Sequence, residues 1–311
     1  MSWEVKTGHT LDELAKLKPK SFQACITSPP YWGLRDYGDK GQQWPAVSYA
    51  PMSGLSALEI PEQLAALGLE PDPAAYVGHL VEVFRAVRRV LRDDGTLWLN
   101  LGDSFANKQL QGIPWRVAYA LQADGWYLRS DIIWHKPNPM PESITDRPTK
   151  AHEYLFLLTK SARYFYDAGA IAEPAGSAGK KISLGEKSLS IGQASGANVK
   201  KVGNALKDSY LVKDTRNKRS VWTIPTRPYS GAHFAVMPPG LVEPCIRAGS
   251  KPGDLILDPF SGAGTTGLIA NRLRRDYIGT EQSEKYAEIS RRRIEGDSPL
   301  FNRQELTNDS R

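Results

Sequence analysis

The sequence predicts an α/β protein built on a mostly parallel, doubly wound sheet. Short apolar runs typical of buried strands alternate along the chain with segments whose apolar residues recur at helical spacing. Such alternation is the pattern of a parallel sheet covered by helices on both faces. A glycine-rich segment near the carboxyl end also follows an apolar run and opens a helical segment, which is typical of a nucleotide-binding turn in these sheets.

The individual elements follow from periodicity. The clearest helix has apolar residues at Leu80, Val83, Phe84 and Val87, and Asp94-Gly95 then turns the chain into the next strand. A short strand or turn is expected at residues 5–8, and a polar tail after residue 297. The predicted strands are 22–26, 96–101, 128–134, 153–158, 255–257 and 277–280, and the predicted helices are 11–17, 76–91, 113–123, 239–248, 265–274 and 284–294. Residues 33–73 are rich in Gly and Pro without strong periodicity, which predicts a functional loop or lid.

A basic insertion interrupts this pattern. Residues 172–219 are mainly Gly, Ser, Ala and Lys with scattered apolar residues. Residues 180–219 contain ten Lys and Arg against three Asp and Glu, a net +7, whereas the whole chain carries +6, which leaves −1 for the rest. A basic segment on a neutral body indicates a polyanion partner, and the alternative is a solvated lysine-rich loop. The expected organisation is one domain formed by residues 1–171 and 221–311, with an insertion at 172–220.

The corner Ser28-Pro29-Pro30-Tyr31 follows the buried strand 22–26. Two consecutive prolines fix φ twice and remove two donors, so the chain leaves the strand as a stiff corner whose carbonyls stay in place. Fixed acceptors beside an aromatic ring suit a planar group with an exocyclic amine, such as a nucleobase. Acceptors that hold the amine hydrogens would free the nitrogen lone pair for attack. The alternative interpretation is an ordinary turn after a strand.

A second candidate site begins at Asp258 and runs through the glycines Gly262, Gly264 and Gly267. Glycines allow close approach of a ligand, and Glu281, which follows the strand 277–280, can accept the hydroxyls of a ribose. The glycines also fit G-x-G-x-x-G, so a dinucleotide-dependent oxidoreductase is an alternative. Too few residues follow Gly267, however, to complete a dinucleotide-binding fold. The carboxylate of Asp258, ahead of the glycines, also suits a cationic amine and is unusual for a pyrophosphate site. S-adenosylmethionine, which has an amine and a ribose but no phosphate, therefore fits better.

With both motifs in view, the chain resembles the amino-group DNA methyltransferases that modify N4 of cytosine or N6 of adenine. It is similar to the permuted beta group, in which the catalytic motif precedes the cofactor glycines. The resemblance covers nearly all of the chain. It implies a Rossmann-like S-adenosylmethionine-dependent methyltransferase fold with a target-recognition insertion, and an enzyme that flips a base out of double-stranded DNA, as in restriction–modification. Ser28, where many adenine-specific members have Asp, favours cytosine N4; adenine N6 remains the alternative.

The resemblance also assigns site residues. It implies catalysis by Ser28, Pro29, Pro30 and Tyr31. The cofactor residues it implies are Thr27, His233, Phe234, Asp258, Pro259, Phe260, Ser261, Gly262, Gly264, Thr265, Thr266, Glu281 and Gln282. The DNA-binding candidates are Trp134, Lys136, Lys200, Lys201, Arg216, Lys218 and Arg219.

Several of these assignments have a purely structural alternative. His233 is as well explained as a turn histidine, and Trp134 as a core residue that caps the sheet. Asn100 and Asp103 end a predicted strand, where a pocket role and helix capping are equally compatible with the sequence. His9 stands where relatives often carry Asp, which puts an adenine contact there in doubt.

The remaining sequence features limit the partners. Cys25 and Cys245 have neither metal-ligand nor redox spacing and are expected in the core of a protein in a reducing compartment. The first seven residues lack an apolar signal region, and no run of 18 apolar residues occurs. We therefore expect a cytoplasmic protein without a metal or membrane partner, as a monomer or homodimer.

Overall fold

The fold comes from a computed structural model, which describes residues 1–34, 41–175, 181–182, 210–211, 214–226 and 236–297. The chain forms two compact units. The first consists of residues 1–167 and 219–311, and the second of residues 168–218. The predicted insertion, 172–220, overlaps the second unit almost completely.

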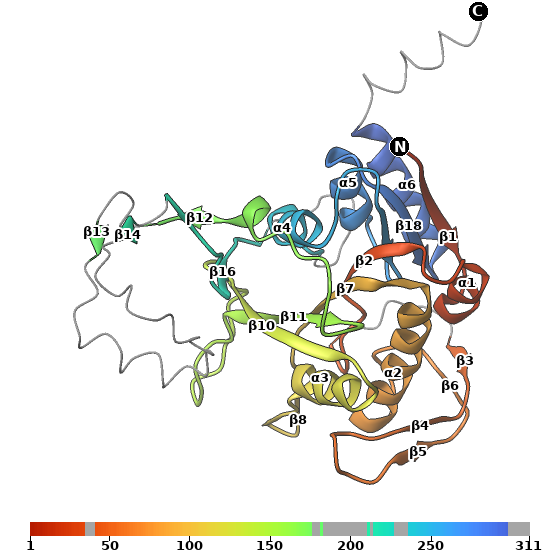
Figure 1. The fold of residues 1–311 in the computed structure, drawn as a ribbon. Helices are drawn as coiled ribbons and strands as arrows, with labels where there is room; N and C mark the ends of the chain where they lie inside the picture. Colours follow the sequence, from red (N-terminus) through yellow and green to blue (C-terminus); the bar gives the residue numbers. More distant parts are fainter. Residues whose placement is uncertain (35–40, 176–180, 183–209, 212–213, 227–235, 298–311) are drawn as a thin grey trace, which may run out of the picture. The chain divides into compact units, whose positions relative to one another are not determined.

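One mixed sheet organises the first unit (Figure 1). Its strands lie in the order β1 (Trp3–Thr7), β18 (Asp276–Glu281), β17 (Leu255–Asp258), β2 (Phe22–Thr27), β7 (Leu91–Leu101), β11 (His152–Thr159), β10 (Tyr127–His135) and β16 (Val221–Thr223). The five strands from β1 to β7 in this order run parallel, and β11 is antiparallel to both of its neighbours. The predicted α/β fold with a mostly parallel sheet is confirmed.

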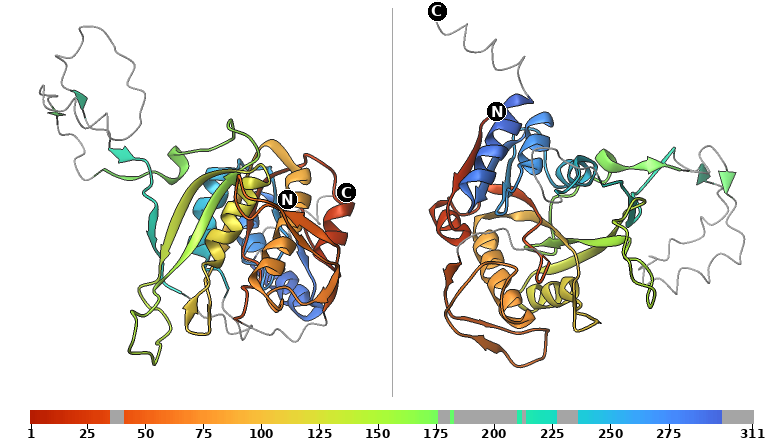
Figure 2. Two further views of the ribbon diagram at one scale, coloured as in Figure 1. Left: turned by 90° about the horizontal axis from the view of Figure 1, so that it is seen from below. Right: turned by 180° about the vertical axis from the view of Figure 1, so that it is seen from behind.

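Helices cover both faces of this sheet (Figures 1 and 2). One layer contains α1 (Thr10–Lys16), α2 (Pro73–Val90) and α3 (Ile113–Ala123), and the other contains α4 (Pro239–Gly249), α5 (Thr265–Arg272) and α6 (Glu284–Gly296). Asp72 caps α2 by accepting hydrogen bonds from the N–H groups of Ala74 and Ala75, and Pro73 occupies the first turn.

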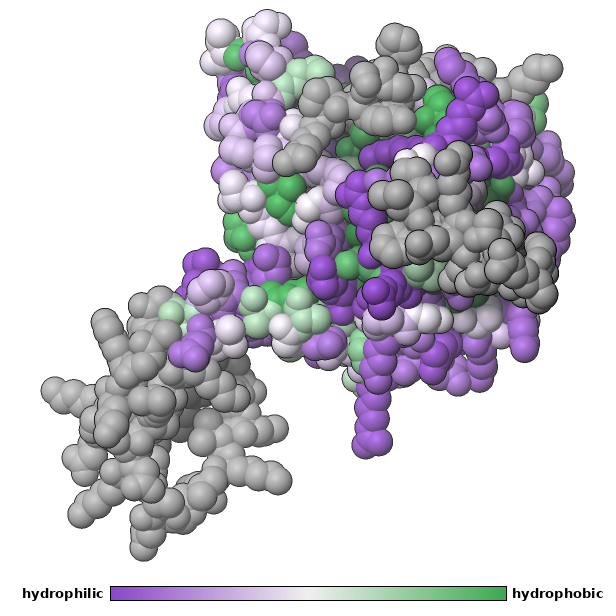
Figure 3. All heavy atoms as spheres, turned by 90° about the horizontal axis from the view of Figure 1, so that it is seen from above, coloured by the Kyte–Doolittle hydropathy of each residue, from purple (hydrophilic) through white to green (hydrophobic). Residues whose placement is uncertain are grey.

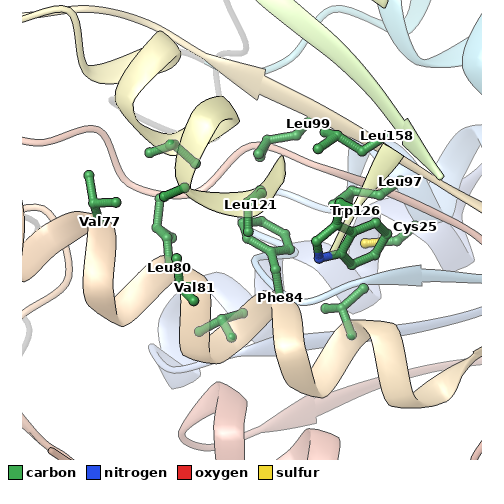
Figure 4. Packing of buried hydrophobic residues seen from close by; sticks show 14 of the residues in the cluster. Cys25, Val77, Leu80, Val81, Phe84, Leu97, Leu99, Leu121, Trp126 and Leu158 are labelled. Carbon is green, nitrogen blue, oxygen red and sulfur yellow. The ribbon is translucent and has the colours of Figure 1, made fainter. Parts of the chain in front are cut away.

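The strand period of two divides the core between the layers. Cys25, Leu97 and Leu99 point to one face, where they pack with α2 and α3 (Figure 4). Trp98 points to the opposite face, where its indole approaches Gly249 of α4 so closely that a Cβ there would lie 2.9 Å from Nε1. Both cysteines are buried thiols, as expected for core residues.

The segment expected as a loop or lid has structure of its own. Within residues 41–65, β3 (Gln42–Trp44) pairs with β6 (Gln63–Ala65), and β4 (Val47–Tyr49) pairs with β5 (Leu58–Ile60). Trp44 and Tyr49 are buried against the same core as α2. The prediction of a lid is wrong for these residues, because their buried aromatic side chains pack in the core of the first unit.

The other described elements are short. They are the hairpin strands β8 (Phe105–Ala106) and β9 (Gln109–Leu110) in the first unit, and β12 (Glu173–Pro174), β13 (Lys181–Ile182), β14 (Tyr210–Leu211), β15 (Thr215–Arg216) and the 3₁₀ turn η1 (Gly169–Ile171) in the second. On the face shown in Figure 3, most coloured residues are hydrophilic and the hydrophobic ones form small separate patches. Among the described helices, none is both long enough and apolar enough to cross a bilayer.

Candidate active site

The two predicted motifs meet at the switch point of the sheet. From β2 the chain passes through α2 on one face to β7, and from the adjacent β17 it passes through α5 on the other face to β18. Ligands of such sheets bind outside the carboxyl ends of the strands where the connections diverge. At this point Thr27 Oγ1 donates a 2.7 Å hydrogen bond to Asp258 Oδ1, although the two residues are 231 positions apart in the chain.

Asp258 anchors the glycine turn from inside. Its carboxylate is buried and accepts hydrogen bonds from the Thr27 hydroxyl and, at 3.1 Å, from the N–H of Phe260. Burial disfavours the charged form and raises the pKa of Asp258 to about 6, although the hydrogen bonds from Thr27, Thr266 and Phe260 oppose that rise. Its ionisation is therefore sensitive to a cation placed nearby.

The three glycines of this turn serve two different purposes. Gly262 has φ +50° and a Cβ placed there would meet only the carbonyl of Phe260, at 3.9 Å, so the space beside it is open. A Cβ on Gly264, where φ is +75°, would lie 2.3 Å from Ser290 Oγ, and one on Gly267 would lie 2.5 Å from both Ile294 and Tyr277. Gly262 can admit a ligand, whereas the other two permit close packing of α5.

Three hydroxyl residues predicted to bind the cofactor have side chains that form contacts inside the protein. Ser261 Oγ lies 2.9 Å from the Tyr277 hydroxyl, Thr265 Oγ1 accepts a 3.0 Å hydrogen bond from Arg293, and Thr266 Oγ1 lies 3.3 Å from the carbonyl oxygen of Ile26. All three side chains are buried. Pro259 is similar, because its carbonyl accepts a hydrogen bond from Thr280.

Glu281 lies across the turn from Gly262. One of its carboxylate oxygens accepts a 2.8 Å hydrogen bond from the N–H of Gly262 and the other accepts one of 3.0 Å from Ser283. The turn before His9 is joined to the same strand end, since the N–H of Gly8 donates to the carbonyl of Glu281. Gln282 is exposed. The carboxylate is thus held at the carboxyl edge, two strands away from Ser28.

The Ser-Pro-Pro-Tyr corner is held by polar contacts. Tyr76 donates a 2.8 Å hydrogen bond to the carbonyl of Pro30, which fixes the second proline. Ser28 Oγ donates to the Tyr31 hydroxyl at 3.1 Å, and the Tyr31 ring packs so closely on Gly102 that a Cβ there would lie 2.6 Å from Cε2. The Tyr31 side chain is therefore held at its hydroxyl by Ser28 and at its ring by the contact with Gly102.

Behind Tyr31 lies a network that the sequence did not predict in full. The Tyr31 hydroxyl lies 2.8 Å from Glu153 Oε2 and 3.1 Å from Asn100 Oδ1, and Lys136 forms an ion pair with the other oxygen of Glu153. Burial, and next the charge of Glu153, raise the pKa of Tyr31 well above its ordinary value. Asn100 was weighed as a pocket residue, whereas Glu153 was missed, because its only sequence signal is an acid at the start of an apolar run.

The structure separates the remaining candidates. Asp103 accepts hydrogen bonds from the N–H groups of Gly112 and Ile113 and so caps α3, which supports its capping role. Trp134 is buried, donates its indole N–H to the carbonyl of Ile224 and lies under Lys136 Nζ at 4.4 Å, so it is placed as a core residue. Lys136 forms an ion pair with Glu153, because β10 ends beside the start of β11.

Of the basic residues predicted to bind DNA in the insertion, three lie within the residues that the structure describes. Arg216 is exposed and pairs with Glu173 at 3.0 Å, Arg219 is exposed, and Lys218 is half-buried. His233, Phe234, Lys200 and Lys201 lie outside the described residues. No group of three or more His, Cys, Asp or Glu that could hold a metal ion occurs within the part of the chain that the structure describes.

Fold and site together define a class, a Rossmann-like methyltransferase fold with permuted motif order. Two solved structures share the fold. The cytosine-N4-specific PvuII DNA methyltransferase superposes with a TM-score of 0.64 at 18% identity, over 97% of this chain and 92% of that one. TTHA0409 from Thermus thermophilus, in complex with S-adenosyl-L-methionine, gives a TM-score of 0.58 at 23% identity, over 97% and 98% of the two chains.

Sequence comparison gives the family. The profile of the N6/N4 DNA methylases matches residues 22–292. The type II methyltransferase M.SmaI of Serratia marcescens is 38% identical over 322 residues, which cover 94% of this chain and 91% of that protein. M.Cfr9I of Citrobacter freundii, also a type II methyltransferase, is 39% identical over 93% of this chain and 87% of its own. The chain belongs to the N6/N4 DNA methylase family, among the type II DNA methyltransferases. This membership argues against the dinucleotide oxidoreductase alternative.

Proposed function

We propose that this protein transfers a methyl group from S-adenosylmethionine to the exocyclic N4 of a cytosine flipped out of double-stranded DNA. The observation that carries the proposal is the hydrogen bond between Thr27 and Asp258, which joins the catalytic corner to the glycine turn at the switch point of the sheet. Methylation of adenine N6 by the same residues is the alternative. Both halves of the site come from one chain, so the reaction needs one copy, and a homodimer would carry two sites.

The residues of the turn fit the cofactor. The open space beside Gly262 allows close approach to the backbone, and the Glu281 carboxylate is held across from it, where it can accept ribose hydroxyls. Asp258 ionises more readily beside a cationic amine, because an opposite charge offsets the cost of its burial. When bound, S-adenosylmethionine would supply an electrophilic methyl group on a positively charged sulfur.

The corner supplies the base side of the reaction. The Ser28 hydroxyl and the Pro29 carbonyl accept the two hydrogens of the amino group, which frees the nitrogen lone pair from the ring. With the cofactor bound, this nitrogen would form its bond to the methyl carbon as the bond from that carbon to sulfur breaks, and the extra proton on nitrogen would pass to solvent. Stacking on Tyr31 contributes about 1 to 3 kcal/mol toward holding the extruded base.

The direct test is the product formed by the wild-type protein and by Ser28→Ala. Mass spectrometry of digested DNA after incubation with labelled cofactor distinguishes 4-methylcytosine from 6-methyladenine. Loss of one preorganised acceptor is expected to lower kcat about 100- to 1000-fold, while cofactor affinity measured by calorimetry stays unchanged. Ser48→Ala is the matched control, because Ser48 is exposed and bonds Glu59 in the β4–β5 ribbon. Full activity of Ser28→Ala would remove its catalytic assignment.

The basic insertion is proposed as the DNA-docking surface. Its candidates are Lys200, Lys201, Arg216, Lys218 and Arg219. Flipping costs a few kcal/mol, and phosphate contacts can offset part of that cost. We expect DNA affinity to fall steeply with salt. The variant R216A/K218A/R219A should reduce the slope of log K against log salt by about 0.9 for each phosphate that is no longer neutralised. An unchanged slope would count against these three residues as phosphate ligands.

A further inference from the structure

The Tyr31 hydroxyl is surrounded by groups that fix the direction of its hydrogen. Glu153 Oε2, at 2.8 Å, is a carboxylate oxygen and therefore an acceptor only. Asn100 Oδ1, at 3.1 Å, is also an acceptor. The orientation of the Asn100 amide follows from its nitrogen, which donates at 3.1 Å to both Glu153 Oε2 and the carbonyl of Tyr154. The single hydrogen of Tyr31 is thus directed toward Asn100 and Glu153.

Ser28 is the remaining partner of that hydroxyl. Its Oγ lies 3.1 Å from the Tyr31 oxygen. Since Tyr31 has no second hydrogen to give, it offers Ser28 only a lone pair, and Ser28 must be the donor. The serine hydrogen therefore points to Tyr31, and the lone pairs of Oγ point elsewhere.

We propose that Glu153 is a positioning residue which, through Tyr31, orients the Ser28 hydroxyl so that this oxygen presents only acceptor lone pairs to the target amino group. The inference rests on the proposed function, since it concerns the acceptor of that reaction. A serine hydroxyl can either donate or accept, and a serine that donated toward the base would place its hydrogen against an amino hydrogen. The network from Ser28 to Glu153 removes that second state.

Lys136 is the cationic partner of Glu153 in this network. Its ammonium pairs with Glu153 Oε1, the oxygen that faces away from Tyr31, and both side chains are largely buried. A donor at Oε1 keeps Oε2 as the oxygen available to Tyr31 and Asn100. The raised pKa of Tyr31 favours the protonated hydroxyl, which has one hydrogen to donate.

The test uses E153Q, which preserves shape but gives one end of the side chain two hydrogens. If the amide oxygen of the new glutamine faces Tyr31, its NH2 group faces the Lys136 ammonium, and two donors meet. If the amide is rotated, the NH2 group faces the Asn100 NH2 group and donates to Tyr31, which reverses the direction of the hydrogen bonds. We expect kcat to fall about 10- to 100-fold, with KM for DNA and calorimetric affinity for S-adenosylmethionine unchanged. E288Q, on an exposed pair of α6, is the control and should not change kcat.

The second variant is K136M/E153Q. Without the Lys136 ammonium, the amide nitrogen can occupy the position of Glu153 Oε1 without facing another donor. The amide oxygen can then again accept from Tyr31. We expect kcat at least about fivefold above that of E153Q alone. Y31F/E153Q should be no slower than Y31F, because Glu153 acts through the Tyr31 hydroxyl.

These results separate two failures. Wild-type kcat in E153Q, or a K136M/E153Q variant no faster than E153Q, would overturn the role of Glu153 while the wild-type protein still methylates DNA. Absence of methyl transfer by the folded wild-type protein would instead refute the proposed function. If E153Q does not fold, as judged by its thermal unfolding, the comparison of K136M/E153Q with wild type and of Y31F/E153Q with Y31F decides the question.

Discussion

The glycine turn and the Ser-Pro-Pro-Tyr corner lie at the ends of neighbouring strands, yet different forces hold them. Besides the hydrogen bonds of Asp258 and Glu281, the turn depends on shape, because Gly264 and Gly267 allow α5 to pack directly on Ser290, Ile294 and Tyr277. The corner is held by hydrogen bonds from residues outside the motif, including Tyr76, Asn100 and Glu153. The difference teaches that a motif residue can be required for packing without touching a ligand.

The largest effect should come from Gly264→Ala. A Cβ at this position would lie 2.3 Å from Ser290 Oγ and 3.0 Å from Ser290 Cα, in a backbone conformation with φ +75°. Overpacking costs about 1 to 3 kcal/mol and a left-handed backbone adds about 1 to 2 kcal/mol. We therefore expect a loss of about 3 kcal/mol in the free energy of unfolding, measured by urea denaturation.

Gly262→Ala tests whether a glycine beside open space differs from the packed Gly264 of the same turn. Its Cβ would meet open space, so only the backbone cost of about 1 to 2 kcal/mol is expected. Cofactor affinity should fall, because the new methyl group occupies the ligand side. Gly253→Ala, with φ +85° and no atom within 4 Å, is the matched control for backbone strain. Equal stability losses for the Gly264 and Gly262 variants would contradict the division of the glycines.

A third prediction concerns Asp258, which links the two regions. Its pKa is about 6 in the folded protein because of burial, against roughly 3.9 in an unfolded chain. Between these values the folded state holds more protons than the unfolded state, so stability decreases as pH rises from about 4 to 6. The change is about 3 kcal/mol at 1.36 kcal/mol per unit. Asp258→Asn should remove this decrease.

Cofactor binding should follow the opposite trend. If the Asp258 carboxylate faces the amine of S-adenosylmethionine, its ionisation strengthens binding, and affinity should rise as pH increases through about 6. Calorimetric titrations of wild type and Asp258→Asn between pH 5 and 7 measure this. A wild-type affinity that does not change over the range would leave Asp258 with a structural role only.

Much of the fold could be predicted because local patterns determined it. The apolar spacing at Leu80, Val83, Phe84 and Val87 located α2, and the alternation of helices and strands gave the doubly wound sheet. The lid prediction failed for the ribbons of residues 41–65, whose three-residue strands are too short to show a period. Their pairing depends on packing against α2, which no local window contains.

The site was predictable only where a motif lay in one segment. Glu153 reaches the carboxyl edge because β11 runs antiparallel to β7, which places the start of β11 where the parallel strands end. Strand direction is a property of the whole sheet and leaves no mark on the residue itself. The inward orientation of Ser261 and Thr265 likewise depends on Tyr277, Ser290 and Arg293, which belong to other elements.

The smallest effect, and the sharpest comparison, should come from Tyr76→Phe. This change removes the 2.8 Å hydrogen bond to the Pro30 carbonyl and is expected to cost about 1 kcal/mol of stability. Tyr49→Phe is a matched control, since Tyr49 is also buried and donates a 2.9 Å hydrogen bond to a backbone carbonyl, that of Ala74, away from the corner. Urea unfolding should give similar losses for both variants, but only Tyr76→Phe should lower kcat, by a fewfold, while cofactor affinity stays unchanged in each. If both variants lowered kcat equally, the corner would depend on general stability, and the contrast between a turn that depends on shape and a corner held by hydrogen bonds would not hold.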